Sequence, residues 1–250
     1  MLEFPHEFAR STPAAGPLNL GLAGTPAAPA GLALFLSAPE SGPVAARLSA
    51  AWGPDRAARF GWECALLVMA KALRLKGADV FVFVTPAERQ AEIESQVMTR
   101  FGRFEGRFLA QRGNTPGERV NHALERLRVM GYDRQLVLGT DSPTIPLEYL
   151  QRAVDELADA DGVIGPTWAG GYYLIGIRRP DVRIFRDVRW GSGLELEQTW
   201  GNLAGLGLTF RMLPRWQNVD SEDDLPFLEG QVRHADYRRL RAILDEPAAP

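Results

Sequence analysis

The sequence predicts a three-layer α/β/α fold around a mostly parallel central sheet. Short apolar runs recur along the chain, and segments with helical spacing separate them. The runs are continuous in Val, Leu, Ile and Phe, which is typical of strands that are buried on both faces. Strands that alternate with helices favour parallel pairing, because each helix carries the chain back across the sheet.

Composition and charge exclude several classes of protein. Of the 250 residues, 46% are hydrophobic and 24% are charged, as in an ordinary globular domain. A net charge of -3 without a long basic run predicts neither a nucleic-acid partner nor binding to an anionic membrane. No apolar run approaches the length of about eighteen residues that a membrane span needs. The N-terminus also lacks the apolar core of a signal peptide, so we expect a cytoplasmic protein.

The elements have recognisable start and stop signals. Residues 1–31 are rich in Ala, Pro and Gly without periodicity, so we expect a loosely ordered extension ahead of one domain over residues 32–250. Pro54 starts a long helix and Gly77 ends it, and the lone Cys64 lies on its apolar face as a buried, inert thiol. The predicted strands cover residues 32–36, 79–84, 107–110, 135–138, 162–165, 172–177 and 208–213. The predicted helices cover residues 54–76, 86–100, 147–157, 194–206 and 236–244, with another that ends near residue 130 and a short one after residue 220.

An acidic residue follows the strand over residues 135–138. Gly139 ends this strand, and Thr140, Asp141, Ser142 and Pro143 form a turn. The carboxyl edge of an open α/β sheet is where ligands bind, and Pro143 keeps the backbone extended just past the acid. A carboxylate held in this way suits a hard cation such as Mg²⁺, which takes one or two carboxylates together with substrate phosphates. The alternative is that Asp141 only caps the turn that follows it.

Asp220 is a second candidate carboxylate, near the start of a short acidic helix. An acidic residue at a helix start is also explained by capping, because the first backbone N–H groups need acceptors.

The loop after the first strand is a candidate phosphate site. Residues 37–43 are rich in Gly, Pro, Ser and Ala, and such small residues let backbone N–H groups approach phosphates. Arg47 follows and could supply a guanidinium. The loop matches neither GxGxxG nor GxxxxGK[ST], which argues against a dinucleotide fold and a P-loop. A plain surface turn is the alternative.

Two further segments combine polar or small residues with a following element. Gln111, Arg112, Glu118 and Arg119 gather ahead of a helix whose N-terminus would attract an anion. The paired glycines at residues 170–171 precede an aromatic strand, so a ligand or another backbone can come close there. A hairpin connection without a ligand is the alternative for the glycine pair.

Several motifs together resemble one family. LALFLSAPESGPVAARL, QRGNTPGERV, VLGTDSPTIP, GPTWAGGYYLIGI, VRWGSG and NVDSEDDL occur in the order and approximate spacing of a bacterial glycosyltransferase-like family. Its members resemble the nucleotide-diphospho-sugar transferases of GT-A fold, and some are described as glycosyltransferases of arsenosugar biosynthesis. The resemblance covers roughly residues 32–228, and its specific motifs are GTDSP and GGYYLIG.

The resemblance implies a GT-A-like domain that binds a nucleotide at its N-terminal half and an acceptor at the other. It implies a transferase that takes a sugar from a nucleotide-activated donor with Mg²⁺ or Mn²⁺, and it identifies no catalytic nucleophile. The residues that it assigns are Ala38, Pro39, Gly42, Arg47 and Arg119 for the nucleotide and its phosphates, Gly170, Gly171, Tyr172 and Trp190 for the sugar or acceptor side, and Asp141 and Asp220 for the metal.

The chain departs from the family pattern at its candidate site. Ala45 and Ala46 stand where the first loop usually has Lys and Thr, and Ala169 stands where an Asp usually precedes the paired glycines. Asn114 and Asn218 also replace Asp. The lost Lys argues against a nucleotidyltransferase, because attack on a nucleoside triphosphate needs more positive charge around the phosphates. A sugar transferase is therefore the first hypothesis, and a nucleotidyltransferase or a non-catalytic nucleotide- or partner-binding homologue remain alternatives. The base, the sugar, the acceptor and the oligomeric state are not readable from the sequence.

Overall fold

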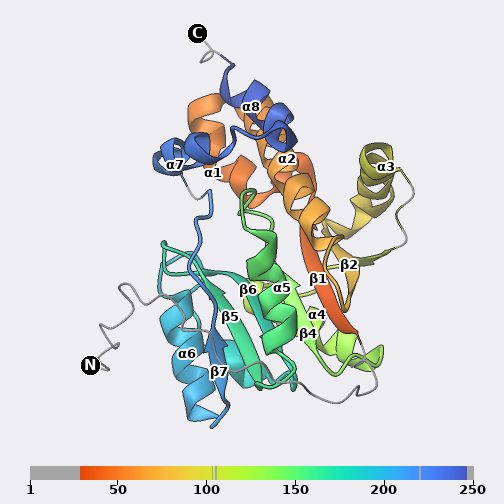
Figure 1. The fold of residues 1–250 in the computed structure, drawn as a ribbon, viewed down its shortest axis with the longest axis vertical. Coiled ribbons are helices and arrows are strands. Elements are labelled where there is room, and N and C mark those ends of the chain that lie inside the picture. The colour runs from red at the N-terminus through yellow and green to blue at the C-terminus, as the bar shows by residue number, and fades with distance from the viewer. Residues whose placement is uncertain (1–28, 103, 105, 220, 247–250) are drawn as a thin grey trace, which may run out of the picture.

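The computed structural model describes residues 29–102, 104, 106–219 and 221–246 of the chain. Figure 1 shows a central sheet with helices on both faces and a group of helices at one end. Most of the predicted N-terminal extension lies outside the described residues. Its last two residues, Ala30 and Gly31, belong to the first strand, because they pair in register with residues 78 and 79 of the second strand.

The sheet has the strand order β3-β2-β1-β4-β6-β5-β7. The β6 strand runs antiparallel to both of its neighbours, and the other strand pairs are parallel, which confirms the predicted mostly parallel sheet. The strands are β1 (Ala30–Ser37), β2 (Ala78–Thr85), β3 (Arg107–Ala110), β4 (Gln135–Leu138), β5 (Gly162–Pro166), β6 (Tyr172–Ile177) and β7 (Phe210–Met212).

The helices follow the predicted order with one addition. The α-helices are α1 (Pro43–Trp52), α2 (Pro54–Ala72), α3 (Gln90–Phe101), α4 (Pro116–Val129), α5 (Leu147–Glu156), α6 (Glu195–Gly205), α7 (Leu225–Gln231) and α8 (Arg238–Leu244). Short 3₁₀ helices are η2 (Pro39–Ser41), η3 (Ala87–Arg89), η4 (Val182–Phe185), η5 (Glu222–Asp224) and η6 (Ala235–Tyr237).

Helix α1 is the addition, and it changes where Arg47 lies. Pro43 lies in the first turn of α1, where a backbone N–H would have no partner within the helix. Gly53 ends α1 and separates it from α2, with a φ of 77°. Arg47 therefore projects from a helix and not from the loop. The predicted helix over residues 54–76 is also too long, since α2 ends at Ala72.

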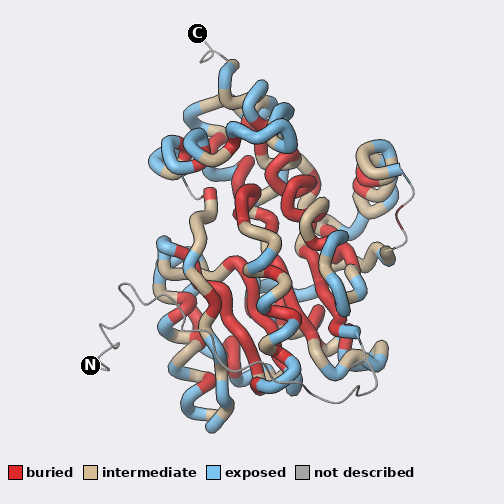
Figure 2. Tube along the Cα trace, in the orientation of Figure 1, coloured by how far each residue is buried: buried red, intermediate tan, exposed pale blue. Residues whose placement is uncertain are grey.

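The sheet is buried on both faces, as its continuous apolar strands predict. In β1, Leu32, Leu34 and Leu36 pack against α2, α3 and α5, whereas Ala33 packs on the opposite side with α4 and α6. This alternation follows from the two-residue period of a strand. Figure 2 shows burial along most of each central strand. Among the helices of the described residues, none combines the length and the apolar character needed to cross a membrane.

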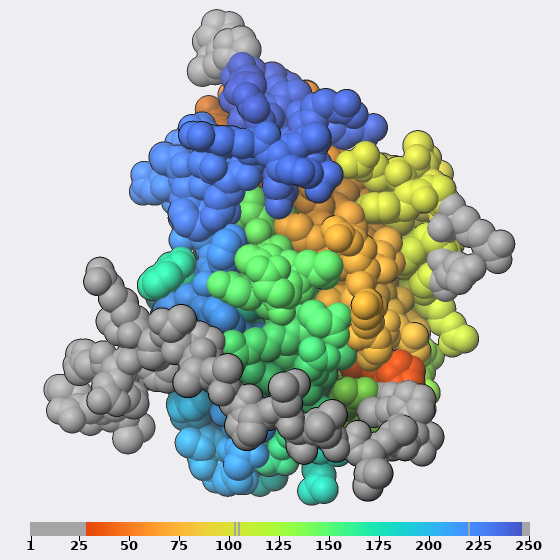
Figure 3. Space-filling view, in the orientation of Figure 1, coloured from red at the N-terminus to blue at the C-terminus, as the bar shows by residue number. Residues whose placement is uncertain are grey.

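A helical cap covers the carboxyl ends of the first strands. It consists of α1, the first half of α2, α7 and α8, and its apolar interior includes Leu48, Phe60, Val219 and Leu228. In Figure 3 its C-terminal residues, in blue, lie against α2, in orange. Cys64 is fully buried in this interior, and burial raises the pKa of its thiol well above the usual range, in agreement with an inert thiol.

The order of the strands defines where a ligand crevice belongs. From β1 the chain adds β2 and then β3 on one side, and β4 then pairs with the other side of β1. The carboxyl ends of β1 and β4 therefore flank the point at which the order reverses, which is the usual ligand position in open α/β sheets. The loop after β1 and the turn with Asp141 lie at this point.

Candidate functional site

The Asp141 turn is held by three hydrogen bonds to two neighbouring segments. Thr140 Oγ1 donates to the carbonyl of Phe35 on β1 at 3.2 Å, and the backbone N–H of Val219 donates to the carbonyl of Asp141 at 2.8 Å. Ser142 Oγ donates to Asn218 Oδ1 at 2.5 Å. The turn is therefore fixed between β1 and residues 218–219, and the carboxylate of Asp141 is positioned by backbone that has little freedom to move.

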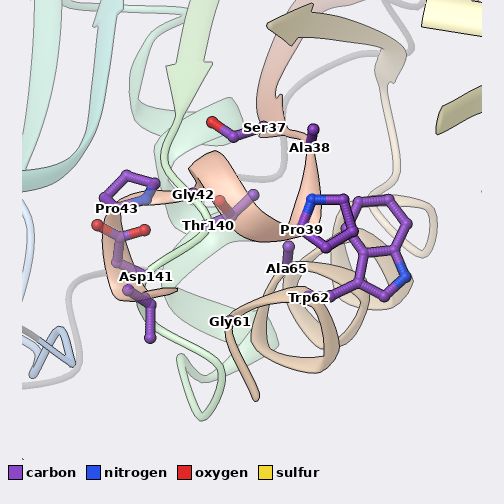
Figure 4. Close-up of a pocket in the computed structure, with 11 residues that line it drawn as sticks. Ser37, Ala38, Pro39, Gly42, Pro43, Gly61, Trp62, Ala65, Thr140 and Asp141 are labelled. Atoms are coloured by element: carbon purple, nitrogen blue, oxygen red, sulfur yellow. The ribbon is translucent and has the colours of Figure 1, made fainter. Parts of the chain in front are cut away.

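A hollow lies beside this turn, between the β1 loop and α2. Figure 4 shows Asp141 beside Pro43 at one end of the hollow and Trp62 beside Pro39 at the other. The hollow is small, with a cavity volume of about 10 Å³, which is room for about one water molecule. The lining residues are Ser37, Ala38, Pro39, Gly42, Pro43, Val44, Gly61, Trp62, Ala65, Thr140 and Asp141. Four residues that the sequence assigns to the site, Ala38, Pro39, Gly42 and Asp141, thus line one space.

Arg47 joins this group through a direct ion pair. Its Nη2 atom lies 2.9 Å from Asp141 Oδ2 and donates to the carbonyl of Val219 at 3.0 Å. The guanidinium therefore links α1 to the Asp141 turn and to the segment that leads into the cap. Arg47, which is predicted to bind phosphate, and Asp141, which is predicted to bind the metal, are thus brought together and bind each other.

The position of the missing lysine is packed inside the cap. Ala45 is 1% exposed, and a Cβ added to Gly61 of α2 would lie 3.1 Å from the backbone nitrogen of Ala45. A lysine at this position would bring a long charged side chain against α2, which is unfavourable without a buried partner. Ala46 is exposed. The substitution at position 45 therefore agrees with the close packing of α1 on α2.

The polar cluster before α4 is largely explained by capping of that helix. Thr115 accepts a hydrogen bond from the N–H of Glu118 at 3.2 Å, and the Glu118 carboxylate accepts one from the N–H of Asn114 at 2.7 Å. Arg119 donates through Nε to the carbonyl of Gly113 at 3.1 Å and does not line the hollow beside Asp141. The role of Arg119 toward a nucleotide stays a prediction.

The paired glycines form a tight junction with the predicted WGSG loop. Gly170 has a φ of 85°, and a Cβ on this residue would lie 1.9 Å from the carbonyl oxygen of Gly193. The carbonyl of Gly170 also accepts a hydrogen bond from Leu196 at 2.9 Å. Of the two alternatives that the sequence left open, it is another backbone that approaches Gly170. Gly171 has room, because the nearest atom to its added Cβ is 3.5 Å away.

Tyr172 and Trp190 pack edge to face, with ring centroids 6.0 Å apart. Burial raises the pKa of Tyr172, whose hydroxyl lies inside the fold beside Thr199. Trp190 lines a separate hollow between α4 and residues 182–190, together with Gly117 and Phe185. The residues predicted for the acceptor side therefore form a group of their own, apart from the hollow beside Asp141.

Of the two predicted metal ligands, Asp141 is among the described residues and Asp220 lies outside them. Within this part of the chain, no three His, Cys, Asp or Glu side chains are grouped closely enough to hold a metal ion. Asp141 alone still fits a cation that arrives with phosphates, since Mg²⁺ commonly takes one or two carboxylates together with phosphate oxygens. Mn²⁺ likewise suits carboxylate ligands.

Two residues, one at the far end of the hollow and one at the Asp141 turn, have no signal in the sequence. Trp62 lies on α2 and its indole lines the hollow. Lys71 donates to the carbonyl of Pro143 at 2.7 Å and to the hydroxyl of Tyr237 at 3.2 Å, and burial lowers its pKa to about 8. Both belong to a long amphipathic helix, where such residues look like ordinary packing and surface positions. Only the tertiary arrangement brings Trp62 to the hollow and Lys71 to the Asp141 turn.

Sheet order, the switch point and the acidic turn define the class of α/β protein to which the nucleotide-diphospho-sugar transferases belong. Residues 68–192 match the family described as "Uncharacterized protein conserved in bacteria (DUF2064)". The chain belongs to this family. No curated protein sequence matches it.

Solved structures share the fold. A protein from Desulfovibrio desulfuricans G20 that is proposed to be a nucleotide-diphospho-sugar transferase is 32% identical, with a TM-score of 0.75 over 86% of this chain and 93% of that one. CMP:2-keto-3-deoxy-manno-octonic acid synthetase complexed with CTP is 14% identical, with a TM-score of 0.51 over 81% and 97%. A 4-diphosphocytidyl-2C-methyl-D-erythritol synthase from Anaerococcus prevotii DSM 20548 is 11% identical, with a TM-score of 0.52 over 83% and 97%. The last two show the fold alone.

Proposed function

We propose that this protein transfers a sugar from a nucleotide-activated donor, with a divalent cation at Asp141. The observation that carries the proposal is the place of the Asp141 carboxylate. It follows β4 at the switch point of the sheet, and it lines a hollow whose other walls come mainly from the small-residue loop after β1 and from α2. This combination suits a cation–diphosphate group, because the carboxylate can bind the cation and the loop leaves room for phosphate oxygens.

The two ends of the hollow suit the two ends of a nucleotide. A divalent cation on the diphosphate would neutralise the charge that develops on the leaving group. Trp62 and Pro39, at the other end, offer flat apolar surface to a base. The hollow has room for about one water molecule, so we expect a nucleotide to lie across its mouth.

Sugar transfer is favoured over nucleotidyl transfer by the charge of the site. Arg47 is paired with Asp141, and Ala45 supplies no cation. A nucleotidyltransferase must stabilise a triphosphate, which requires more positive charge than a diphosphate leaving group. The relative with 32% identity is also proposed to act on nucleotide sugars.

The proposal is tested by thermal shift with nucleotide sugars, nucleoside diphosphates and nucleoside triphosphates, each with and without Mn²⁺. A ligand at a hundred times its dissociation constant stabilises the folded state by about 2.7 kcal/mol. For a chain of this size that raises Tm by about 5–10 °C. We expect such a shift with one nucleotide sugar, only when Mn²⁺ is present.

Two variants test whether the Mn²⁺-dependent thermal shift depends on Asp141. Asp141→Asn should abolish the Mn²⁺-dependent shift and leave the Tm of the free protein nearly unchanged. Asp133→Asn is the matched control, because Asp133 is exposed and precedes β4 at the opposite edge of the sheet. A shift that Asp141→Asn retains in full would remove Asp141 from the site. No shift with any nucleotide would favour the non-catalytic alternative, and a shift confined to triphosphates would favour the nucleotidyltransferase.

A further inference from the structure

Arg47 and Asp141 form an ion pair with each other in the structure. The guanidinium binds Asp141 Oδ2 at 2.9 Å, and the two side chains are 33% and 18% exposed. The same Nη2 atom donates to the carbonyl of Val219 at 3.0 Å. A positive group therefore already lies against one of the two oxygens of the carboxylate that would bind a divalent cation.

The surroundings of this pair are fixed, so that Arg47 is the part that can move. Val219 donates to the carbonyl of Asp141 at 2.8 Å, and Val219 itself is buried in the cap. Thr140 Oγ1 ties the same turn to β1. By contrast, the Arg47 side chain is long and partly exposed, and the tip of its guanidinium makes the contacts to Asp141 and Val219. A ligand that exchanges the tip of Arg47 does not need to move the turn.

We propose that Arg47 is a specificity-determining residue that reserves Asp141 for a divalent cation delivered together with a diphosphate. The inference rests on the proposed function and adds to it that the cation binds together with the diphosphate and not alone. A bare cation that binds this carboxylate either displaces the guanidinium or lies beside it, and both arrangements oppose binding. A cation–diphosphate complex removes this penalty, because the diphosphate gives Arg47 new acceptors that it can bind in a bidentate manner.

This arrangement couples the two ligands. If the diphosphate strengthens binding of the cation by a given factor, then the cation must strengthen binding of the diphosphate by the same factor. We expect a factor of roughly ten or more in the protein as it is, within the range of common couplings. Without Arg47 the factor should fall, because the bare cation gains affinity while the complex loses a partner.

Equilibrium dialysis measures these affinities directly, with Mn²⁺ alone and with Mn²⁺ plus inorganic pyrophosphate as the probes. The excess of Mn²⁺ on the protein side reports protein-bound metal in both cases. Arg47→Gln should bind bare Mn²⁺ about fivefold more tightly than the parent protein, as removal of a partly exposed ion pair allows. The same variant should bind Mn²⁺–pyrophosphate more weakly. Arg47→Lys keeps the positive charge, so bare Mn²⁺ should stay weak.

The control is Arg59→Gln, which removes one positive charge from an exposed ion pair with Glu246 on the cap. It should change neither affinity. Urea denaturation of each variant shows whether its fold is intact, and Arg47→Lys serves as the test of charge if Arg47→Gln is unstable.

The outcomes separate this inference from the proposed function. Bare Mn²⁺ that binds Arg47→Gln no better than the parent, while Asp141→Asn abolishes binding of Mn²⁺–pyrophosphate, overturns the role of Arg47 and leaves the site standing. Binding that Asp141→Asn leaves unchanged overturns both. Both are also overturned if the parent protein binds neither Mn²⁺ nor Mn²⁺–pyrophosphate.

Discussion

Gly170 and Gly171 are adjacent in sequence but should respond very differently to alanine. At Gly170 the φ of 85° costs a residue with a Cβ about 1–2 kcal/mol. The new Cβ would also lie 1.9 Å from the carbonyl oxygen of Gly193, which is far inside van der Waals contact. The backbone must therefore shift, and the hydrogen bond from Leu196 to the Gly170 carbonyl is lost, at about 1 kcal/mol. We expect Gly170→Ala to reduce the free energy of unfolding by about 3 kcal/mol.

Gly171→Ala is the internal control. Its added Cβ makes ordinary contact, 3.5 Å from Thr167 Oγ1, and alanine reduces the entropy of the unfolded chain. We expect its free energy of unfolding to stay within about 1 kcal/mol of the parent.

Urea denaturation followed by circular dichroism measures both variants, and thermal melts give a second reading. A loss of about 3 kcal/mol lowers Tm by roughly 6–12 °C for a chain of this size. Equal midpoints for the two variants would refute the reasoning, because they would mean that the turn before β6 is not packed on Gly193. A difference confined to the m-value would instead indicate a change in the unfolded state.

Two further predictions concern titratable groups of the cap and the turn. Because burial lowers the pKa of Lys71 to about 8, the unfolded chain binds more protons than the folded one above that pH, and stability should rise with pH. The gain should be about 2 kcal/mol between pH 8 and pH 10; urea midpoints across this range should show it in the parent protein but not in Lys71→Met, and parallel curves would contradict it. Cys64 should react with a thiol reagent such as DTNB only at the rate of unfolding, since it is fully buried and its pKa is raised. Rapid labelling of the native protein would show that the cap opens.

The strands could be predicted because the signal of a strand, an apolar run and the residues that end it, lies within a short stretch of sequence. The strands over residues 107–110, 135–138 and 172–177 have the predicted bounds, since continuous apolar runs end there at polar, Gly or Pro residues. Helix α1 was missed, because its ten residues follow directly from a Gly- and Pro-rich loop and bury only Val44, Ala45 and Leu48. A helix this short depends on tertiary packing for most of its stability.

The candidate site could be predicted in its parts but not in its contacts. The Asp141 turn and the β1 loop are visible as motifs, and the rule for strand order places both at one edge. The pairing of Arg47 with Asp141 spans 94 positions, however, and depends on α1 being a helix and on the cap holding Val219. The position of Trp62 in the hollow likewise depends on tertiary structure, because packing sets the path of α2 across the β1 loop.

Under the proposed function, a divalent cation neutralises more of the phosphate charge here than in a relative with a lysine in the first loop. The charges of Arg47 and Asp141 neutralise each other in the ion pair, and the packed Ala45 adds no charge. A diphosphate that enters without a cation therefore meets one guanidinium that must first leave a carboxylate, and the freed carboxylate then repels the phosphates. With a cation bound as proposed, the carboxylate would be its ligand, and Arg47 would be available to the diphosphate, whose charge offsets the repulsion between the two positive groups. The loss of the lysine is thus consistent with an active site that recognises the cation–diphosphate complex as a single unit, and it does not by itself require a loss of activity.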